Sequence, residues 1–162
     1  MVVVDSSALI PLAWVGRLDL VDAVFDDVQT TTIVEDEVLV DGKRGTGALE
    51  RFLADVTVRK PPTRSDEVAS MEGIAVGDAS VVLLAAAEDE PLLANDKGLV
   101  TVARSHGVDA WWVTTLLLAC RKNEVIDADE ASDVLYDLVS EGMNLSPQVY
   151  VKVQRKVEEI GE

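Results

Sequence analysis

The chain has 162 residues, 48% of them hydrophobic, which is enough for one domain with a sizeable core and excludes an intrinsically disordered chain. The 30 acidic residues outnumber the 14 basic ones, so the net charge is −16. The acids are spread along the chain rather than gathered in a tail. They therefore predict a solvated acidic coat, which we interpret as that of a halophilic host; an acidic protein from a mesophile is the alternative.

The residue types also restrict the cellular compartment in which the protein is expected and the kinds of catalysis it can perform. No stretch resembles a membrane span or a signal peptide, so we expect a cytoplasmic protein. Cys120 is the only cysteine, which excludes an internal disulfide and a Cys-rich zinc site and fits a buried, reduced thiol. His106 is the only histidine and stands at a predicted helix end. Catalysis by a Ser-His-Asp or Cys-His arrangement is therefore disfavoured.

In chain order, the first predicted element is the β-branched run 2–4, which fits a central parallel strand buried on both faces and ends at Asp5. Ser6 or Ser7 is expected to cap the helix that follows. Further strands are predicted at 28–32, 56–59, 92–94 and 108–113, the last holding both Trp111 and Trp112. Helices are predicted between them, so the fold class is α/β, with a parallel sheet of about five strands flanked by helices.

The predicted helix that begins at Asp78 is apolar nearly all round as far as residue 87, which indicates a buried helix. After residue 113 only helices are expected, at 116–122, 129–142 and 147–160. We therefore expect one domain over residues 1–162, with an α/β core at 1–113 and a helical extension at 114–162. The last helix is rich in β-branched residues. It either packs on the same core or contacts a second subunit, as in a homodimer.

Four acids stand where a parallel sheet would bring them to one cleft. Asp5 and Asp96 follow strands, Glu37 lies in the helix after the second strand, and Asp78 opens the buried helix. Local roles are the alternative, with Asp78 as a helix cap and Asp96 as a turn former. Clustered carboxylates without His or Cys indicate Mg²⁺ or Mn²⁺, ions that activate water and stabilise charge in phosphodiester hydrolysis.

Segments in this order resemble the PIN-domain family over nearly the whole chain, most of all its small prokaryotic branch related to VapC-type toxins. They are VVVDSSALIPLAWVGRLDLV, IVEDEVLVDGK, GDASVVLLAAAEDEPLLANDKGLVTVARSHGV and the final stretch from VTTLLLAC to VYVKV. The resemblance implies a PIN-like fold and metal-dependent RNA cleavage that leaves 5′-phosphate and 3′-hydroxyl ends. The family's motif acids fall on Asp5, Glu37, Asp78 and Asp96, which would be both the catalytic residues and the metal ligands.

Around these acids, the resemblance places Ser7 and Asn95 in the shell that orders the metal ligands. The sequence departs from the family at Ala94, where Thr or Ser is frequent in the family, and at Asn95, where this branch often has an acid. Both departures weaken a second metal site. A nuclease must also hold a polyanion, so Lys43, Arg44 and Lys97 are the predicted phosphate contacts, with Arg104, Arg121 and Lys122 as further candidates. Solvated loop and helix charges are the alternative.

Three function classes follow from these patterns. The first is a Mg²⁺- or Mn²⁺-dependent endoribonuclease, as the toxin of a toxin–antitoxin pair with an antitoxin-type protein partner. The second is a non-catalytic PIN-like module that binds RNA or a protein, which the residues at Ala94 and Asn95 favour. The third is another acid-cluster phosphate enzyme or a receiver domain. It is disfavoured because Asp5 is not part of a DxD motif and no glycine-rich phosphate loop is present.

Overall fold

The computed structural model describes residues 1–160 and contains a five-stranded sheet in which all pairs are parallel. The sheet order is β3-β2-β1-β4-β5. The strands are β1 (Val2–Val4), β2 (Val28–Thr31), β3 (Thr57–Arg59), β4 (Leu92–Leu93) and β5 (Ala110–Trp111). Since β1 is central, the chain builds outward through β2 and β3 and then returns to the other side at β4. A crevice at the carboxyl ends of β1 and β4 follows from this change of direction.

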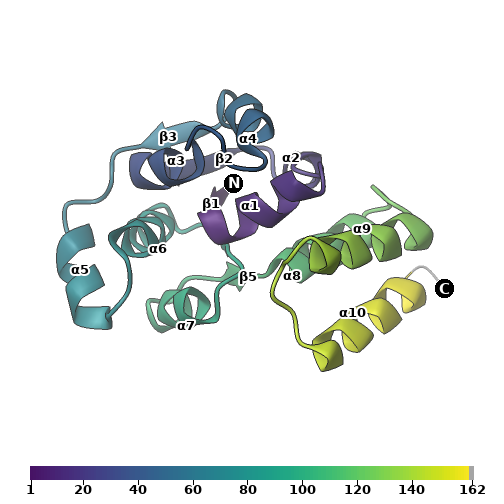
Figure 1. Cartoon of the computed structure of the whole chain (residues 1–162). Helices are drawn as coiled ribbons and strands as arrows, with labels where there is room; N and C mark the ends of the chain where they lie inside the picture. The colour runs from purple at the N-terminus through teal and green to yellow at the C-terminus, as the bar shows by residue number, and fades with distance from the viewer. Residues whose placement is uncertain (161–162) are drawn as a thin grey trace.

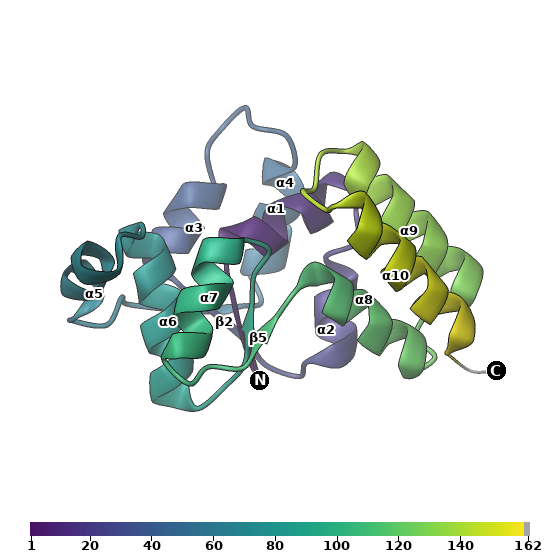
Figure 2. The same cartoon turned by 90° about the horizontal axis from the view of Figure 1, so that it is seen from below.

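Helices flank the sheet, and the predicted α/β class and PIN-like architecture are confirmed (Figure 1). Within residues 1–160 the helices are α1 (Ser6–Trp14), α2 (Asp19–Val24), α3 (Thr32–Val38), α4 (Thr46–Leu53), α5 (Ser65–Glu72), α6 (Val76–Glu88), α7 (Lys97–Ser105), α8 (Val113–Lys122), α9 (Ala128–Ser140) and α10 (Pro147–Glu159). Helix α5 and the α9–α10 pair lie at opposite ends of the molecule in both views (Figures 1 and 2).

Three local predictions were wrong. Asp5, not Ser6 or Ser7, is the N-cap of α1, because its carboxylate accepts the amide of Ser7. Asp78 does not open α6: the helix begins two residues earlier, at Val76, so Asp78 lies inside the first turn. Only Trp111 belongs to the last strand, since Trp112 already has the extended backbone of the N-cap of α8. Each error concerns an element boundary, which local residue preferences define least well.

One continuous hydrophobic core joins the sheet to the C-terminal helices. The three valines of β1 are fully buried, and the same core includes Leu117 of α8, Leu135 of α9 and Val157 of α10. Helix α10 buries Val153 and Val157 but leaves Val149 and Val151 40% and 48% exposed. Intramolecular packing therefore accounts for one face of α10, and its other face is open to solvent.

Helix α6 is buried along its middle, as predicted from its apolar sequence. In residues 1–160 no single helix is both long and apolar enough to cross a membrane. Helices α5 and α6 reach the required length and composition only together, and they are bent by 114° at the break between them.

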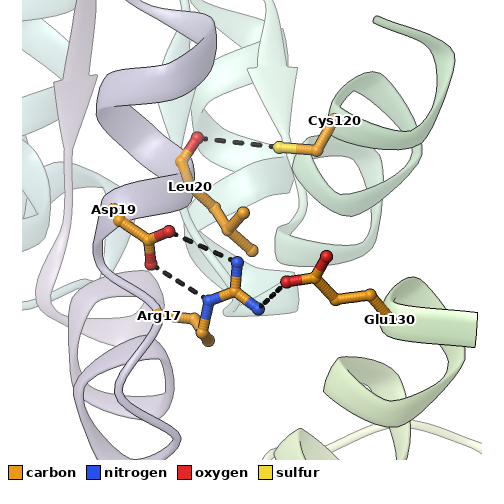
Figure 3. A network of polar contacts seen from close by, with 5 residues as sticks. All are labelled: Arg17, Asp19, Leu20, Cys120 and Glu130. Atoms are coloured by element: carbon orange, nitrogen blue, oxygen red, sulfur yellow. Dashed lines mark hydrogen bonds and ion pairs between the residues drawn. The ribbon is translucent and has the colours of Figure 1, made fainter. Parts of the chain in front are cut away.

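Polar contacts tie α2 to the C-terminal helices on the side of the molecule shown in Figure 3. The Arg17 guanidinium, just before α2, forms ion pairs with Asp19 at 3.1 Å and with Glu130 of α9 at 2.9 Å. The Cys120 thiol is buried and donates a weak hydrogen bond to the Leu20 carbonyl at 3.7 Å. Burial, and to a smaller extent Asp19, raises the pKa of this thiol to about 11, so Cys120 stays protonated at neutral pH.

Candidate functional site

Asp5 is the best-ordered acid of the predicted cluster. It directly follows β1, and only 1% of its surface is exposed. Its Oδ2 accepts hydrogen bonds from the Ser7 amide at 3.0 Å and from the Ser7 hydroxyl at 2.6 Å. Its Oδ1 is buried and has no hydrogen-bond partner among the described residues. Because an unpaired buried carboxylate oxygen is costly, it marks a position where a ligand or ion would be stabilising.

Ser7 connects Asp5 to the neighbouring strand. The backbone amide of Asn95, which follows β4, donates to Ser7 Oγ at 2.8 Å. The Asp5 amide in turn donates to the Leu93 carbonyl at 3.0 Å. A chain of hydrogen bonds therefore runs from Asn95 through Ser7 to Asp5 and fixes the carboxyl ends of β1 and β4 side by side. Ser7 and Asn95 thus lie beside Asp5, where they were expected, but the contribution of Asn95 comes from its backbone.

Asp96 and Asp78 each lie in the first turn, or at the cap, of a helix that starts near this edge. Asp96 is the N-cap of α7, with its Oδ1 accepting the Leu99 amide at 2.9 Å, and its side chain is exposed. The local role predicted as an alternative for Asp96 is therefore real, in the form of a helix cap rather than a turn. Asp78 is half-buried and provides no side-chain cap for α6.

Electrostatic coupling shows that the structure brings the four acids together. Burial, followed by the charges of Asp5, Asp96 and Glu37, raises the pKa of the Asp78 carboxyl to about 6. Burial also raises the pKa of Asp5, and the charge of Glu37 adds to this effect, while the Ser7 hydrogen bonds oppose it. Like charges raise a carboxyl pKa only at short range. The four carboxylates therefore share one electrostatic environment at the carboxyl end of β1.

Two residues that the sequence did not single out position Glu37 and Asp78. A Cβ atom on Gly77 would lie 3.2 Å from Ile33 Cγ2 of α3 and 3.6 Å from Glu37 Oε2, so glycine allows α3 and α6 to approach closely. Ser80 Oγ lies 2.8 Å from the Thr31 hydroxyl and donates to the Gly77 carbonyl at 2.6 Å. These contacts join the end of β2 to the first turn of α6.

The donor set suits a hard divalent cation. Carboxylate oxygens are the ligands that Mg²⁺ and Mn²⁺ prefer, and the unpaired Asp5 oxygen lies among them. In the described part of the chain no three acidic, His or Cys side chains converge closely enough to hold an ion as they stand. Asp5 is fixed, whereas Glu37 and Asp96 are exposed. Because the Asp96 carboxylate also caps α7, the adjustment needed for a shared ion falls first on Glu37.

Comparison with known proteins gives the family. Residues 1–159 match the family model DUF3368, described as a PIN domain. The chain belongs to this PIN-domain family. PIN domains are generally nucleases and typically use divalent metal ions. The family predicted from the motifs is confirmed, while its VapC-related branch stays a prediction.

Two solved structures are similar to this PIN domain. PAE2754 from Pyrobaculum aerophilum is 20% identical and has a TM-score of 0.54, with 74% of this chain and 94% of that chain covered. The PilT N-terminus domain protein SSO1118 from the hyperthermophilic archaeon Sulfolobus solfataricus P2 is also 20% identical. Its TM-score is 0.51, with 71% and 88% of the two chains covered. At these identities the likeness concerns the fold alone. No curated protein matches the sequence.

The three bases predicted to hold RNA differ in their surroundings. Arg44 of this PIN domain pairs with Glu141 at 2.8 Å, donates to the Glu141 carbonyl at 2.9 Å, and lies 4.1 Å above the centre of the Trp14 ring. Lys43 and Lys97 are exposed and form no ion pair within residues 1–160. The two lysines are therefore available to phosphates, whereas Arg44 must first leave Glu141.

Three adjoining hollows follow this edge of the PIN domain. The first, about 280 Å³, is lined by Glu37, Lys43 and Arg44 and shares Ile10 and Trp14 with the second. The second, about 190 Å³, contains Ser7 and shares Asn95 and Asn144 with the third, of about 530 Å³. The shared lining residues show that the hollows are neighbours. Together they form a path along which Glu37, Ser7 and Lys97 lie, although Asp5, Asp78 and Asp96 line none of the three hollows.

Proposed function

We propose that this PIN domain is an endoribonuclease that hydrolyses RNA phosphodiester bonds with Mg²⁺ or Mn²⁺ held by Asp5, Glu37, Asp78 and Asp96. The observation that carries the proposal is the electrostatic coupling of four carboxylates around a buried Asp5 with one unpaired oxygen. Such a concentration of negative charge is unfavourable for the isolated fold. It becomes favourable when a cation is bound, which is why it indicates function rather than stability.

A bound divalent cation would act as a Lewis acid at the phosphate and make water a stronger nucleophile near neutral pH. The chain supplies the fixed geometry. Ser7 holds the Asp5 carboxylate through Oδ2 and thereby leaves Oδ1 directed to ligand binding. Asp78, whose pKa is about 6, is mostly ionised above neutral pH and retains a proton in mild acid. Lys43 and Lys97 would contact phosphates on the two sides of the cleavage position.

The test is single-turnover cleavage of a mixed RNA pool with Mn²⁺, at high salt and without a co-purified protein. Asp5→Asn should lower the rate by orders of magnitude and leave RNA binding intact, because it removes a metal ligand and adds no repulsion. Cys120→Ala and His106→Ala are the controls. The thiol is buried and protonated, and the imidazole is engaged with Glu72 at 3.2 Å. Equal cleavage by wild type and Asp5→Asn would refute the nuclease proposal.

A non-catalytic module that binds RNA or a protein is the second candidate. It is favoured by Ala94, which is fully buried and carries no hydroxyl, and by Asn95, which offers no carboxylate beside Asp96. In that case wild type and Asp5→Asn would bind RNA equally and neither would cleave it with any divalent ion. The same assay therefore separates the two candidates.

A toxin role is the finer part of the proposal. It requires an antitoxin-type protein partner, and the resemblance of the motif segments to the VapC-related branch supports it. A short open reading frame immediately upstream of the gene is the expected observation. Co-expression of that frame should abolish cleavage and give a stable complex, whereas an isolated gene would favour RNA processing. A homodimer formed through the exposed face of α10 belongs to the same proposal, and sedimentation of the purified chain tests it.

A further inference from the structure

The largest of the three hollows has a wall unlike the rest of this acidic surface. It is lined by Asn95, Lys97, Trp112, Thr114, Asn144, Leu145, Ser146 and Val149. The chain has 30 acidic residues, yet none of them is among these lining residues. The one charged group is Lys97, which is exposed and forms no ion pair within residues 1–160. The hollow is therefore a place where an anionic ligand meets no carboxylate.

The amino-terminal ends of helices add to the positive charge that Lys97 brings to the hollow. Lys97 lies in the first turn of α7, Thr114 in that of α8, and Ser146 is the N-cap of α10. The amino-terminal ends of three helices therefore border one hollow. Each carries partial positive charge, which favours a phosphate nearby. This agrees with the charge of Lys97 and with the absence of acids from the wall.

Trp112, Leu145 and Val149 are the apolar residues that line the hollow. Trp112 is also partly buried against the core, and the other two come from the α9–α10 connection and α10. The neighbouring Trp111 has another role, since that ring packs edge-to-face on Phe25 at 5.1 Å. An indole beside amide and hydroxyl side chains is the usual composition of a site for an unstacked nucleobase. The volume of about 530 Å³ lies in the range of small-ligand pockets.

The hollow is linked to the acid cluster through the residues on either side of Asp96. Asn95 and Lys97 are the two neighbours of Asp96, and the Ala94 amide donates to the Trp111 carbonyl at 3.0 Å. Trp112 directly follows Trp111, so it lies where β5 pairs with the end of β4. Helices α7 and α8 both contact β5, and all three elements lie together in the two views (Figures 1 and 2). A nucleotide in the hollow would lie beside Asn95 and Lys97, the two residues that flank Asp96.

We propose that this hollow receives one unstacked base of single-stranded RNA, with Trp112 as the stacking surface, Asn144 as a polar contact to the base edge, and Lys97 at the adjoining phosphate. The proposal rests on the proposed function, because it assigns a base site to the strand whose phosphodiester lies at the acids. It also gives the α9–α10 connection a function, since Asn144 and Leu145 form one wall of the substrate site.

The test measures binding separately from cleavage. Fluorescence anisotropy with Ca²⁺ in place of Mn²⁺ compares a labelled single-stranded hexanucleotide with the same strand carrying abasic positions. For the complete strand, Trp112→Leu should weaken binding roughly 5- to 100-fold, the range that corresponds to losing one stacked base. It should leave the abasic strand unaffected, and Trp112→Tyr should restore most of the affinity. Trp111→Phe is the matched control and should bind both strands like wild type.

A second variant does not depend on removing a core-packed ring. Val149→Trp introduces a large side chain at a position where the native one is 40% exposed, so it should fold and fill the hollow. It should weaken binding of the complete strand and leave that of the abasic strand unchanged. Wild-type binding that is absent, or that is the same for complete and abasic strands, overturns the proposal. So does an equal effect of Trp112→Leu on both strands.

The two proposals fail in distinguishable ways. Base-dependent binding through Trp112 without any Mn²⁺-dependent cleavage would refute the nuclease proposal and support the base-site proposal. Cleavage that depends on Asp5 but is unchanged by Trp112→Leu and Val149→Trp would refute the base-site proposal and support the nuclease proposal.

Discussion

The hydroxyl of Ser7 donates to Asp5 Oδ2 at 2.6 Å and at the same time accepts the Asn95 amide at 2.8 Å. One small side chain therefore fixes a buried carboxylate and joins the ends of two strands. Losing it would leave the partly buried Asn95 amide without an acceptor and the buried Asp5 carboxylate with less hydrogen bonding, which are both costly.

We therefore expect Ser7→Ala to lower the free energy of unfolding by about 1–3 kcal/mol and to raise the pKa of Asp5 further. Urea denaturation measures the first effect, and carboxyl titration by NMR measures the second. Ser6→Ala is the matched control, because the neighbouring Ser6 is buried but its hydroxyl, unlike that of Ser7, forms no hydrogen bond within the described residues. Equal losses for the two variants would contradict the role given to Ser7.

The raised pKa of Asp78 predicts how metal-free stability depends on pH. Its ordinary value is 3.8 and its folded value about 6, so the folded state binds the proton more tightly than the unfolded state. This group thus favours folding below about pH 4, and its contribution is lost as the pH rises through about 6. Asp78→Asn should be more stable than wild type at pH 7.5, by on the order of 1 kcal/mol because the carboxyl is half-exposed and screened.

Chemical denaturation of both proteins in EDTA at several pH values checks this prediction. The advantage of Asp78→Asn should shrink between about pH 6 and pH 4 and vanish below that range. A difference that is constant with pH would mean that the carboxylate charge is not its cause.

Metal binding should depend on both strand-end acids. Mn²⁺ or Mg²⁺ is expected to bind with a Kd on the order of micromolar to millimolar, and the double variant Asp5→Asn, Asp96→Asn should abolish the calorimetric signal. Asparagine is also a good N-cap, so both helices keep their caps and the variant should fold. Asp89→Asn, at the opposite end of α6 from Asp78, removes one carboxylate charge away from the site and should leave binding unchanged. Undiminished binding by the double variant would refute the shared site.

Salt should govern the stability of the whole chain. Because the net charge is −16, the acidic side chains repel one another in dilute buffer. At about 1 M salt the Debye length falls to about 3 Å, so this repulsion is screened. Thermal unfolding should therefore show a rising Tm between about 0.1 and 2 M KCl. A Tm that is flat or falls over this range would contradict the acidic coat of a halophilic protein.

Freeing Arg44 should strengthen RNA binding. The ion pair between Arg44 and Glu141 is about half exposed on both sides, so Glu141→Gln should cost at most about 1 kcal/mol of stability. It should lower the Kd for RNA and make the salt dependence steeper by about one phosphate contact. Glu130→Gln, which breaks the pair with Arg17, removes the same charge and is the control. If both variants shift RNA affinity equally, the gain comes from net charge and not from Arg44.

The sequence alone was sufficient for the fold class, and it indicated four acids whose catalytic and metal-binding roles stay predictions. A run of three valines favours a strand buried on both faces, and an acid directly after such a strand is expected at its carboxyl end. The apolar character of α6 follows equally from a short-range pattern. These features depend on neighbours within a few residues, so local preference and periodicity determine them.

Tertiary structure decided everything that joins distant segments. Ser7 and Asn95 are 88 positions apart, and Arg44 and Glu141 are 97 apart. No periodicity relates such pairs, because their contact depends on sheet order and on where the C-terminal helices pack. The sequence placed Trp112 in the last strand, yet it lines a hollow together with Asn144 and Leu145 of the α9–α10 connection. The pairing of β1 with β4 and the packing of α10 onto a common core create that neighbourhood, and the residues on either side carry no local sign of it.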